Sequence, residues 1–147
     1  MATALQRPLP IAISAERVLV SVDMAAAMMG MHADRIVERL DGDWPWAWDL
    51  TARQGRREIR IWRRMVEDPA AVPSPTSPQA IAQVIAAVIG TETGDVRGAF
   101  LETRWGFSGQ HFHRLMRQGL VAGRKHGHTR WLDRQSLGRW MEQRLMK

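Results

Sequence analysis

Apolar residues recur near the start of the chain with the spacing of short amphipathic elements. Residues 21–30 and 34–40 show helical spacing, with a serine suited to cap the first helix and a glycine suited to end it. Alternation typical of strands follows in a tryptophan-rich stretch at 44–50 and again at 58–62, and residues 63–67 favour a brief helix. The pattern predicts two helices, a two-stranded hairpin and a closing helix.

The last third of the chain shows the same order of elements. We expect helices at 96–105 and 108–118, strands at 120–122 and 129–132 around a tight turn at 125–128, and a final helix at 133–145. When Gly30 is aligned with Gly106, Ile36 falls on Phe112. Identity between the two segments is low, so the chain carries a repeat of pattern rather than a demonstrated duplication.

A proline-rich segment separates the two parts. Residues 69–78 contain four prolines, which cannot sustain a helix or an interior strand, so we expect an extended linker there. The chain therefore divides into an N-terminal unit at 1–68, a linker with a connecting helix at 69–94, and a C-terminal unit at 95–147. The connecting helix has a broad apolar face, which must be buried against one of the units or between two copies of the chain.

Composition narrows the class of protein. The 147 residues include no cysteine, which excludes disulfides, thiolate catalysis and cysteine-ligated zinc. No apolar stretch reaches about 18 residues and no secretory signal pattern opens the chain, so we expect a cytoplasmic protein without membrane contact. Nucleophile elbows, phosphate-binding glycine loops and paired carboxylates are missing, and the histidines lack companion ligands. We therefore expect no catalysis, no cofactor and no metal site.

The net charge of +6 is unevenly distributed. The N-terminal unit carries ten basic and ten acidic residues, and the linker region carries a single glutamate. The C-terminal unit carries 11 basic and four acidic residues, which is a net charge of +7. Nineteen of the 21 basic residues are arginine, a bias that either serves phosphate and base contacts or reflects a GC-rich genome.

Two helices joined by a tight turn and followed by a two-stranded wing are a DNA-binding arrangement, in which the second helix enters the major groove. In the C-terminal unit, Phe112, Leu115 and Met116 form the inward stripe of that helix. The polar residues expected toward solvent are Gln110, His111, His113, Arg114 and Arg117. The residues of the wing suited to phosphate contact are Arg124, Lys125, His126, His128 and Arg130. The alternative is an ordinary solvated charged face.

The C-terminal unit resembles the excisionase branch of the MerR-like winged helix-turn-helix proteins. The resemblance rests on residues 106–121, which read GFSGQHFHRLMRQGLV, and on residues 127–137, which read GHTRWLDRQSL. It implies that Ser108 to Arg117 is the recognition helix and that Arg124 to Arg130 is the wing. The N-terminal unit matches more loosely over 19–67. The implied fold is mainly α with small β wings, as tandem winged helix-turn-helix units joined by a proline-rich linker and a helix.

The N-terminal unit departs from that pattern. Its second helix presents acidic residues, and carboxylates repel phosphates, so it is poorly suited to read a groove. Positive charge lies instead on its hairpin, where we expect Arg56, Arg57 and Arg60 to touch the DNA backbone. The alternatives are a unit used for protein contact and an arginine-rich surface loop. His32 is also a poorer helix cap than Ser108.

Three closely spaced tryptophans mark the hairpin of the N-terminal unit. Trp44, Trp46 and Trp48 are too close together for all of them to be buried. They form a small core under the wing, a protein interface or a base-stacking platform.

These patterns predict a sequence-specific double-stranded DNA-binding protein. Its role is that of a transcription regulator or of a recombination or excision accessory factor of a mobile element. The alternatives are a protein-interaction adaptor that uses the neutral N-terminal unit, and the DNA-recognition subunit of a phage packaging machine. We expect a homo-oligomer, because such regulators usually bind repeated half-sites. No small-molecule substrate is expected.

Overall fold

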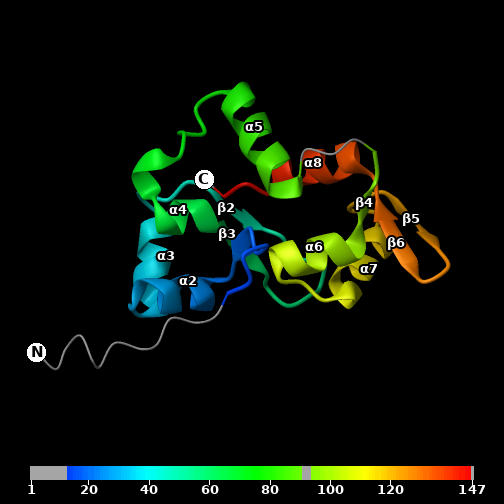
Figure 1. Ribbon diagram of the computed structural model, residues 1–147, viewed down its shortest axis with the longest axis horizontal. Helices are drawn as coiled ribbons and strands as arrows, with labels where there is room; N and C mark the ends of the chain where they lie inside the picture. The colour runs from blue at the N-terminus through cyan, green and yellow to red at the C-terminus, as the bar shows by residue number, and fades with distance from the viewer. Residues whose placement is uncertain (1–12, 91–93, 147) are drawn as a thin grey trace, which may run out of the picture.

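Two small antiparallel sheets, each with its own helices, make up the fold seen in the computed structural model, which describes residues 13–90 and 94–146 (Figure 1). The first sheet has the strand order β1 (Leu19–Val20), β3 (Ile59–Trp62), β2 (Ala47–Asp49). The second sheet has the strand order β4 (Val96–Arg97), β6 (Thr129–Leu132), β5 (Gly123–His126). In both units the chain runs from the first strand through two helices into the hairpin, so the two units share one connectivity.

Local capping explains the first two helices of the N-terminal unit. The Ser21 hydroxyl accepts a hydrogen bond from the backbone N–H three residues later (3.1 Å) at the start of α2 (Val22–Met29). Gly30 ends this helix in the left-handed region, at φ 63°. The next helix, α3 (Ala33–Leu40), begins after His32, whose Nδ1 accepts from the backbone N–H two residues later at 3.2 Å. The expectation that His32 is a poorer cap than Ser108 is therefore wrong, because the Ser108 hydroxyl makes no capping hydrogen bond.

The proline-rich segment is pinned to the N-terminal unit rather than extended throughout. α4 (Arg63–Glu67) leads into a 3-10 turn, η1 (Pro69–Ala71). The Pro73 carbonyl then accepts a hydrogen bond from Trp46 Nε1 at 2.6 Å, and Val72 is half-buried against the same core. The prediction of an extended linker is wrong for this part of the segment. The physical reason is that the N–H of a buried indole needs an acceptor, and the segment supplies it.

The connecting helix, α5 (Pro78–Ile89), packs on α8 (Arg134–Gln143) within the same chain (Figure 1). Its buried residues are Val84, Ile85, Val88 and Ile89. Trp105 Nε1 donates to the Val88 carbonyl at 3.0 Å, which ties the helix to the C-terminal unit as well. Packing against a unit was one of the two alternatives for this helix. Its apolar face is covered without a second copy, so the expected homo-oligomer loses the support of that face.

Several element boundaries of the C-terminal unit differ from the predicted ones. The hairpin turn is limited to residues 127–128, and the last helix ends at Gln143. Two further differences concern where an element begins. Residues 96–97 form β4, which pairs with β6, and α6 (Gly98–Trp105) begins only after it. The strand β5 begins later than predicted, because residues 120–121 both donate hydrogen bonds to the Leu115 carbonyl in the turn after α7 (Gly109–Arg117). Both differences arise from backbone hydrogen bonds that residue periodicity does not reveal.

All three tryptophans of the 44–48 stretch are buried. The exposed fractions of Trp44, Trp46 and Trp48 are 1%, 0% and 0%. The ring of Trp46 lies 6.0 Å from that of Trp62 in an edge-on arrangement and 6.2 Å from that of Trp48. The expectation that they are too closely spaced to be buried is wrong, because Trp48 is also covered from the other unit, where it pairs with Leu145. Their burial supports the small-core alternative.

The two units are joined by their backbones as well as by a shared apolar core. The chain beyond α8 returns to the outer strand of the first sheet. There Met146 N–H donates to the Ala47 carbonyl at 2.8 Å, and Asp49 N–H donates to the Arg144 carbonyl at 2.9 Å. The last described residues therefore extend the sheet of the N-terminal unit, which holds the two units in one arrangement.

Candidate nucleic-acid interface

The second helix of the C-terminal unit, α7, is held in place by aromatic packing on its inner side. Phe112 is fully buried, with its ring 6.1 Å from that of Trp105 and 5.7 Å from that of Phe107, and Leu115 is buried one turn later. Ser108 lies at the N-cap position, although its hydroxyl makes no capping hydrogen bond. The polar side chains exposed on the outer face of α7 are Gln110, His113, Arg114 and Arg117.

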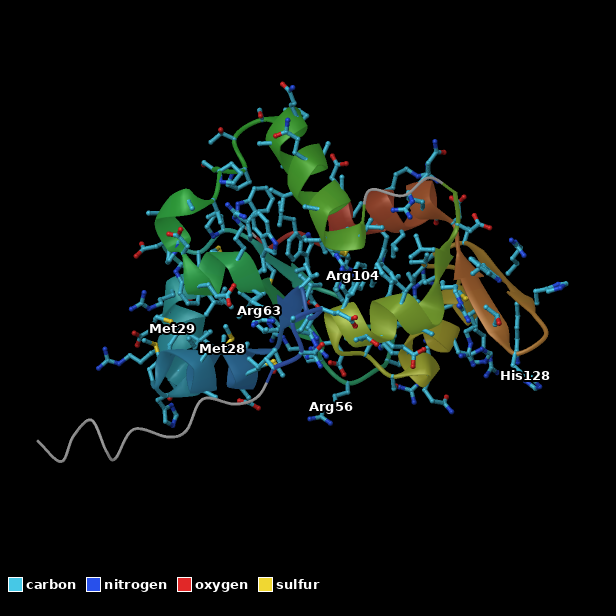
Figure 2. The ribbon with its side chains drawn as sticks, in the orientation of Figure 1. Met28, Met29, Arg56, Arg63, Arg104 and His128 are labelled. Carbon is cyan, nitrogen blue, oxygen red and sulfur yellow. The ribbon has the colours of Figure 1, made fainter. Side chains whose placement is uncertain are left out.

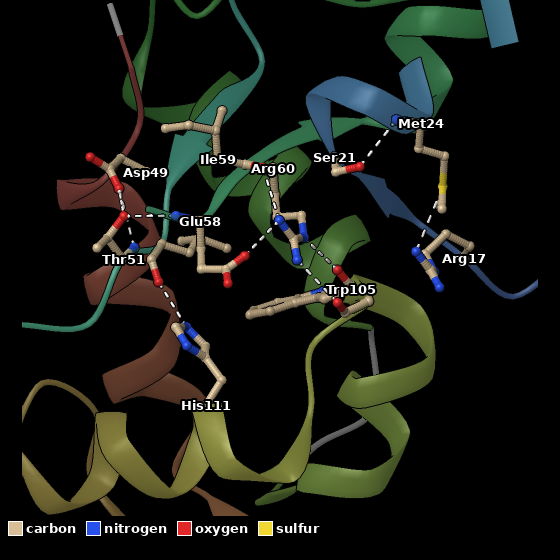
Figure 3. A network of polar contacts seen from close by, with 12 residues as sticks. Arg17, Ser21, Met24, Asp49, Thr51, Glu58, Ile59, Arg60, Trp105 and His111 are labelled. Carbon is tan, nitrogen blue, oxygen red and sulfur yellow. Dashed lines mark hydrogen bonds and ion pairs between the residues drawn. The ribbon is translucent and has the colours of Figure 1, made fainter. Parts of the chain in front are cut away.

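His111 does not belong to that exposed face. Its side chain is buried, with 7% of the residue exposed, and its ring stacks on Phe107 at 4.2 Å. Its Nε2 lies 2.8 Å from the Leu50 carbonyl of the N-terminal unit (Figure 3). Burial lowers the pKa of His111, because the charged imidazolium is poorly solvated there. The prediction that His111 faces solvent is wrong, since the N-terminal unit covers this side of the helix.

The β5–β6 hairpin extends from the C-terminal unit at the end of the molecule opposite α2 and α3 (Figure 1). A two-residue turn closes it, and Gly127 adopts φ 63° there, a conformation that favours glycine. The exposed polar residues of the hairpin are Arg124, Lys125, His126 and His128, the last of which lies at the tip (Figure 2). Arg130 is half-buried, and Arg124 already pairs with Asp95 at 3.2 Å.

The segment that builds α7 and the hairpin carries charge of one sign. Residues 103–132 contain six lysines and arginines and no aspartate or glutamate. Two carboxylates from outside this segment reach it: Asp95 pairs with Arg124 of the hairpin, and Glu102 lies against Gly109 at the start of α7. A surface with this composition attracts polyanions over the range of a Debye length, about 8–10 Å at ordinary ionic strength.

Arg60 is a second predicted contact that the structure buries. Only 8% of the residue is exposed. Its guanidinium donates to the Trp105 carbonyl (2.9 Å) and to the Gly106 carbonyl (3.0 Å) at the end of α6, and it pairs with Glu58 at 3.1 Å (Figure 3). Burial lowers the pKa of Arg60, and Glu58 opposes that effect. The expectation that Arg60 touches DNA is wrong, because carbonyls of both units and the Glu58 carboxylate take up its donors.

The remaining predicted residues of the N-terminal unit lie on the loop between β2 and β3. Arg56 and Arg57 are exposed, and Figure 2 shows Arg56 pointing away from the body of the molecule. Within this loop Gln54 adopts φ 60°, which turns the chain back toward β3. Sequence reasoning did not connect Arg53 with Gln118. The two residues are 65 positions apart in the chain, and only the fold brings them together.

Side chains of the metal-binding types come together at most in pairs, such as His32 and Asp34, within residues 13–90 and 94–146. In these ranges no three of them gather as a metal site would require. No helix within the same ranges combines the length and apolarity needed to cross a membrane.

Comparison with known proteins identifies no relative: no protein-family model, curated protein or solved structure matches this chain.

Proposed function

We propose that this protein binds double-stranded DNA sequence-specifically, with α7 entering the major groove and the β5–β6 hairpin lying along the backbone. The order of strand, two helices and hairpin is that of a winged helix-turn-helix unit, and its occurrence in both units supports a tandem arrangement. The resemblance to excisionase-like proteins favours a regulator or a recombination accessory factor.

The observation that carries this proposal is the outer face of α7. Gln110, Arg114 and Arg117 are exposed there, and no carboxylate side chain occurs between residues 103 and 132. Glutamine and arginine pair with the edges of adenine and guanine, and arginine also binds phosphate through two parallel hydrogen bonds. The outer face of α7 itself carries arginine and neutral polar side chains, while the carboxylate of Glu102 on α6 lies against its first residue, Gly109.

The test is fluorescence anisotropy with the full chain and a labelled mixed-sequence duplex of about three helical turns, over a series of salt concentrations. We expect the logarithm of the affinity to fall linearly with the logarithm of the salt concentration. The double variant Arg114→Ala, Arg117→Ala should bind more weakly, and its salt slope should be smaller by about one for each phosphate that it no longer neutralises.

A charge-matched control is Arg35→Ala, Arg64→Ala, because both residues are exposed on helices of the N-terminal unit away from α7. This control should keep the wild-type salt slope. Binding that is absent at low salt, or that does not depend on α7 arginines, would overturn the proposed function. Enrichment of one motif from a random duplex library tests sequence specificity with the same protein.

A further inference from the structure

We infer that the loop between β2 and β3, residues 50–58, is a second basic arm of the α7 surface, so that one duplex contacts both units at once. This role rests on the DNA binding proposed above. It adds a phosphate-binding site at the junction of the two units and assigns a positioning role to Gln118.

A pair of hydrogen bonds fixes the loop to the end of α7. The N–H of Arg53 donates to Gln118 Oε1 at 2.8 Å, and Gln118 Nε2 donates to the Arg53 carbonyl at 2.9 Å. The side-chain amide of Gln118 thus pairs with both backbone groups of one residue, as a neighbouring strand would. The Arg53 side chain is left exposed by this arrangement.

A second anchor lies toward the start of the helix, where His111 meets the Leu50 carbonyl at 2.8 Å. His111 and Gln118 are separated by about two helical turns, or roughly 10 Å along the axis. Three residues of extended chain, from Leu50 to Arg53, span about the same distance. The loop therefore runs alongside α7, and its tip reaches the end of the helix that carries Arg117.

The loop and the C-terminal unit line an open surface hollow of about 620 Å³. Its lining residues include Arg53, Arg57, Arg144, Asp49, Leu120 and Trp140. Arg144 already donates to the Asp49 carbonyl at 2.7 Å and pairs with the Asp49 carboxylate at 3.6 Å. Arg53 and Arg57 remain exposed, and their planar guanidinium groups match the oxygens of a phosphate group.

The ligand that fits this hollow is the backbone of a duplex already held by α7. The arginines at its rim continue the positive charge of that helix, and Arg56 adds a further exposed guanidinium on the same loop. The hydrogen bonds to Gln118 and His111 hold the segment from Leu50 to Arg53 beside α7 before DNA binds, which reduces the ordering entropy lost on association.

The first test compares Arg53→Ala, Arg57→Ala with wild type and with the charge-matched control Arg35→Ala, Arg64→Ala, using the same labelled duplex. We expect the loop variant to lose affinity on the order of tenfold, and its salt slope to fall by about one for each phosphate left without an arginine partner. The control should keep the wild-type slope. Thermal unfolding of each variant checks that folding is intact.

The second test is a double-mutant cycle on Gln118. Gln118→Ala removes no charge, yet we expect it to weaken binding several-fold in the wild-type background because the loop is no longer held beside α7. In the Arg53→Ala, Arg57→Ala background the same substitution should change affinity little. An equal effect in both backgrounds, or no effect in either, would overturn the positioning role.

These outcomes distinguish failure of this inference from failure of the proposed function. If Arg114→Ala, Arg117→Ala weakens binding while Arg53→Ala, Arg57→Ala does not, the inference of a second basic arm is wrong and DNA binding by α7 stands. If the wild-type chain binds no duplex at low salt, both the inference and the proposed function are wrong.

Discussion

At the scale of single residues, burial separates side chains of one chemical type into different roles. Arg60 and Arg56 are four positions apart on the same hairpin, yet one ties two units together and the other is exposed. His111 and His113 differ in the same way on α7. In each pair the buried member meets backbone carbonyls of the opposite unit, which lies far away in the chain. The residue type therefore indicated which interactions a side chain can make. It did not indicate whether that side chain is exposed or buried against the other unit.

The buried imidazole of His111 predicts a dependence of stability on pH. Burial lowers its pKa in the folded protein, whereas the unfolded chain keeps the ordinary value of about 6.5. As the pH falls, the unfolded chain takes up the proton first. The contribution of His111 to the free energy of unfolding is therefore complete above about pH 6.5 and is lost below it, by at most about 1.4 kcal/mol per pH unit.

Urea unfolding at a series of pH values checks this expectation. The control is His111→Gln, whose side-chain N–H still donates to the Leu50 carbonyl without titrating. The wild-type chain should lose more stability than this variant between about pH 6.5 and 5. Equal losses would show that His111 does not carry the pH dependence.

At the scale of elements, the apolar stripes and most helix caps were predictable because they depend on residues a few positions apart, although His32 caps its helix and Ser108 does not. Ser21, Ser77 and Asp133 each cap the helix that the sequence places after them, with side-chain bonds of 3.1, 3.1 and 2.9 Å. The short strands β1 and β4 were not predicted. Each has two residues and exists through pairing with a strand more than 30 positions away, which no local pattern encodes.

The β5–β6 hairpin depends on close approach of its strands at Gly123. A Cβ there would lie 2.6 Å from the Trp131 carbonyl oxygen and 3.0 Å from the Met116 side chain. We expect Gly123→Ala to destabilise the protein by about 1–3 kcal/mol, because backbone must shift to admit the methyl group.

The matched control is Gly42→Ala, since the nearest atom to a Cβ at that position is 3.8 Å away. It should change stability by no more than about 0.5 kcal/mol. Both values follow from urea unfolding curves. If Gly123→Ala unfolds at the same urea concentration as the wild-type chain, the hairpin accommodates the methyl group.

At the scale of the whole molecule, polar and apolar contacts join the two units. The guanidinium of Arg60 satisfies two carbonyls that end α6, and the residues after α8 extend the first sheet. The charge distribution and the prolines predicted two units separated by a linker. In the structure, hydrogen bonds and backbone pairing connect these two units directly. The tandem DNA-binding role stays a prediction.

Arg60→Leu tests how strongly the units depend on each other. The substitution leaves the Trp105 and Gly106 carbonyls without this donor and Glu58 without its ion-pair partner. We expect a loss of about 2–4 kcal/mol in the free energy of unfolding. Because the residue contacts both units, tryptophan fluorescence and circular dichroism should report one common transition at a lower urea concentration.

Arg56→Leu serves as the control on the same hairpin, because Arg56 is exposed and should matter little for stability. Two separate transitions in the wild-type chain, or an unchanged midpoint for Arg60→Leu, would contradict the coupling.

The sequence by itself determined the order of the longer helices, the two hairpins and the concentration of positive charge in the C-terminal unit. Those features depend on capping, on periodicity and on composition, which act within a few residues. Only the tertiary structure decided which polar side chains remain exposed, and that the hairpin loop of one unit lies beside α7 of the other. The physical reason is that burial and hydrogen bonding depend on the surface packed opposite, and for Arg60, His111 and Gln118 that surface comes from 45 to 65 residues away.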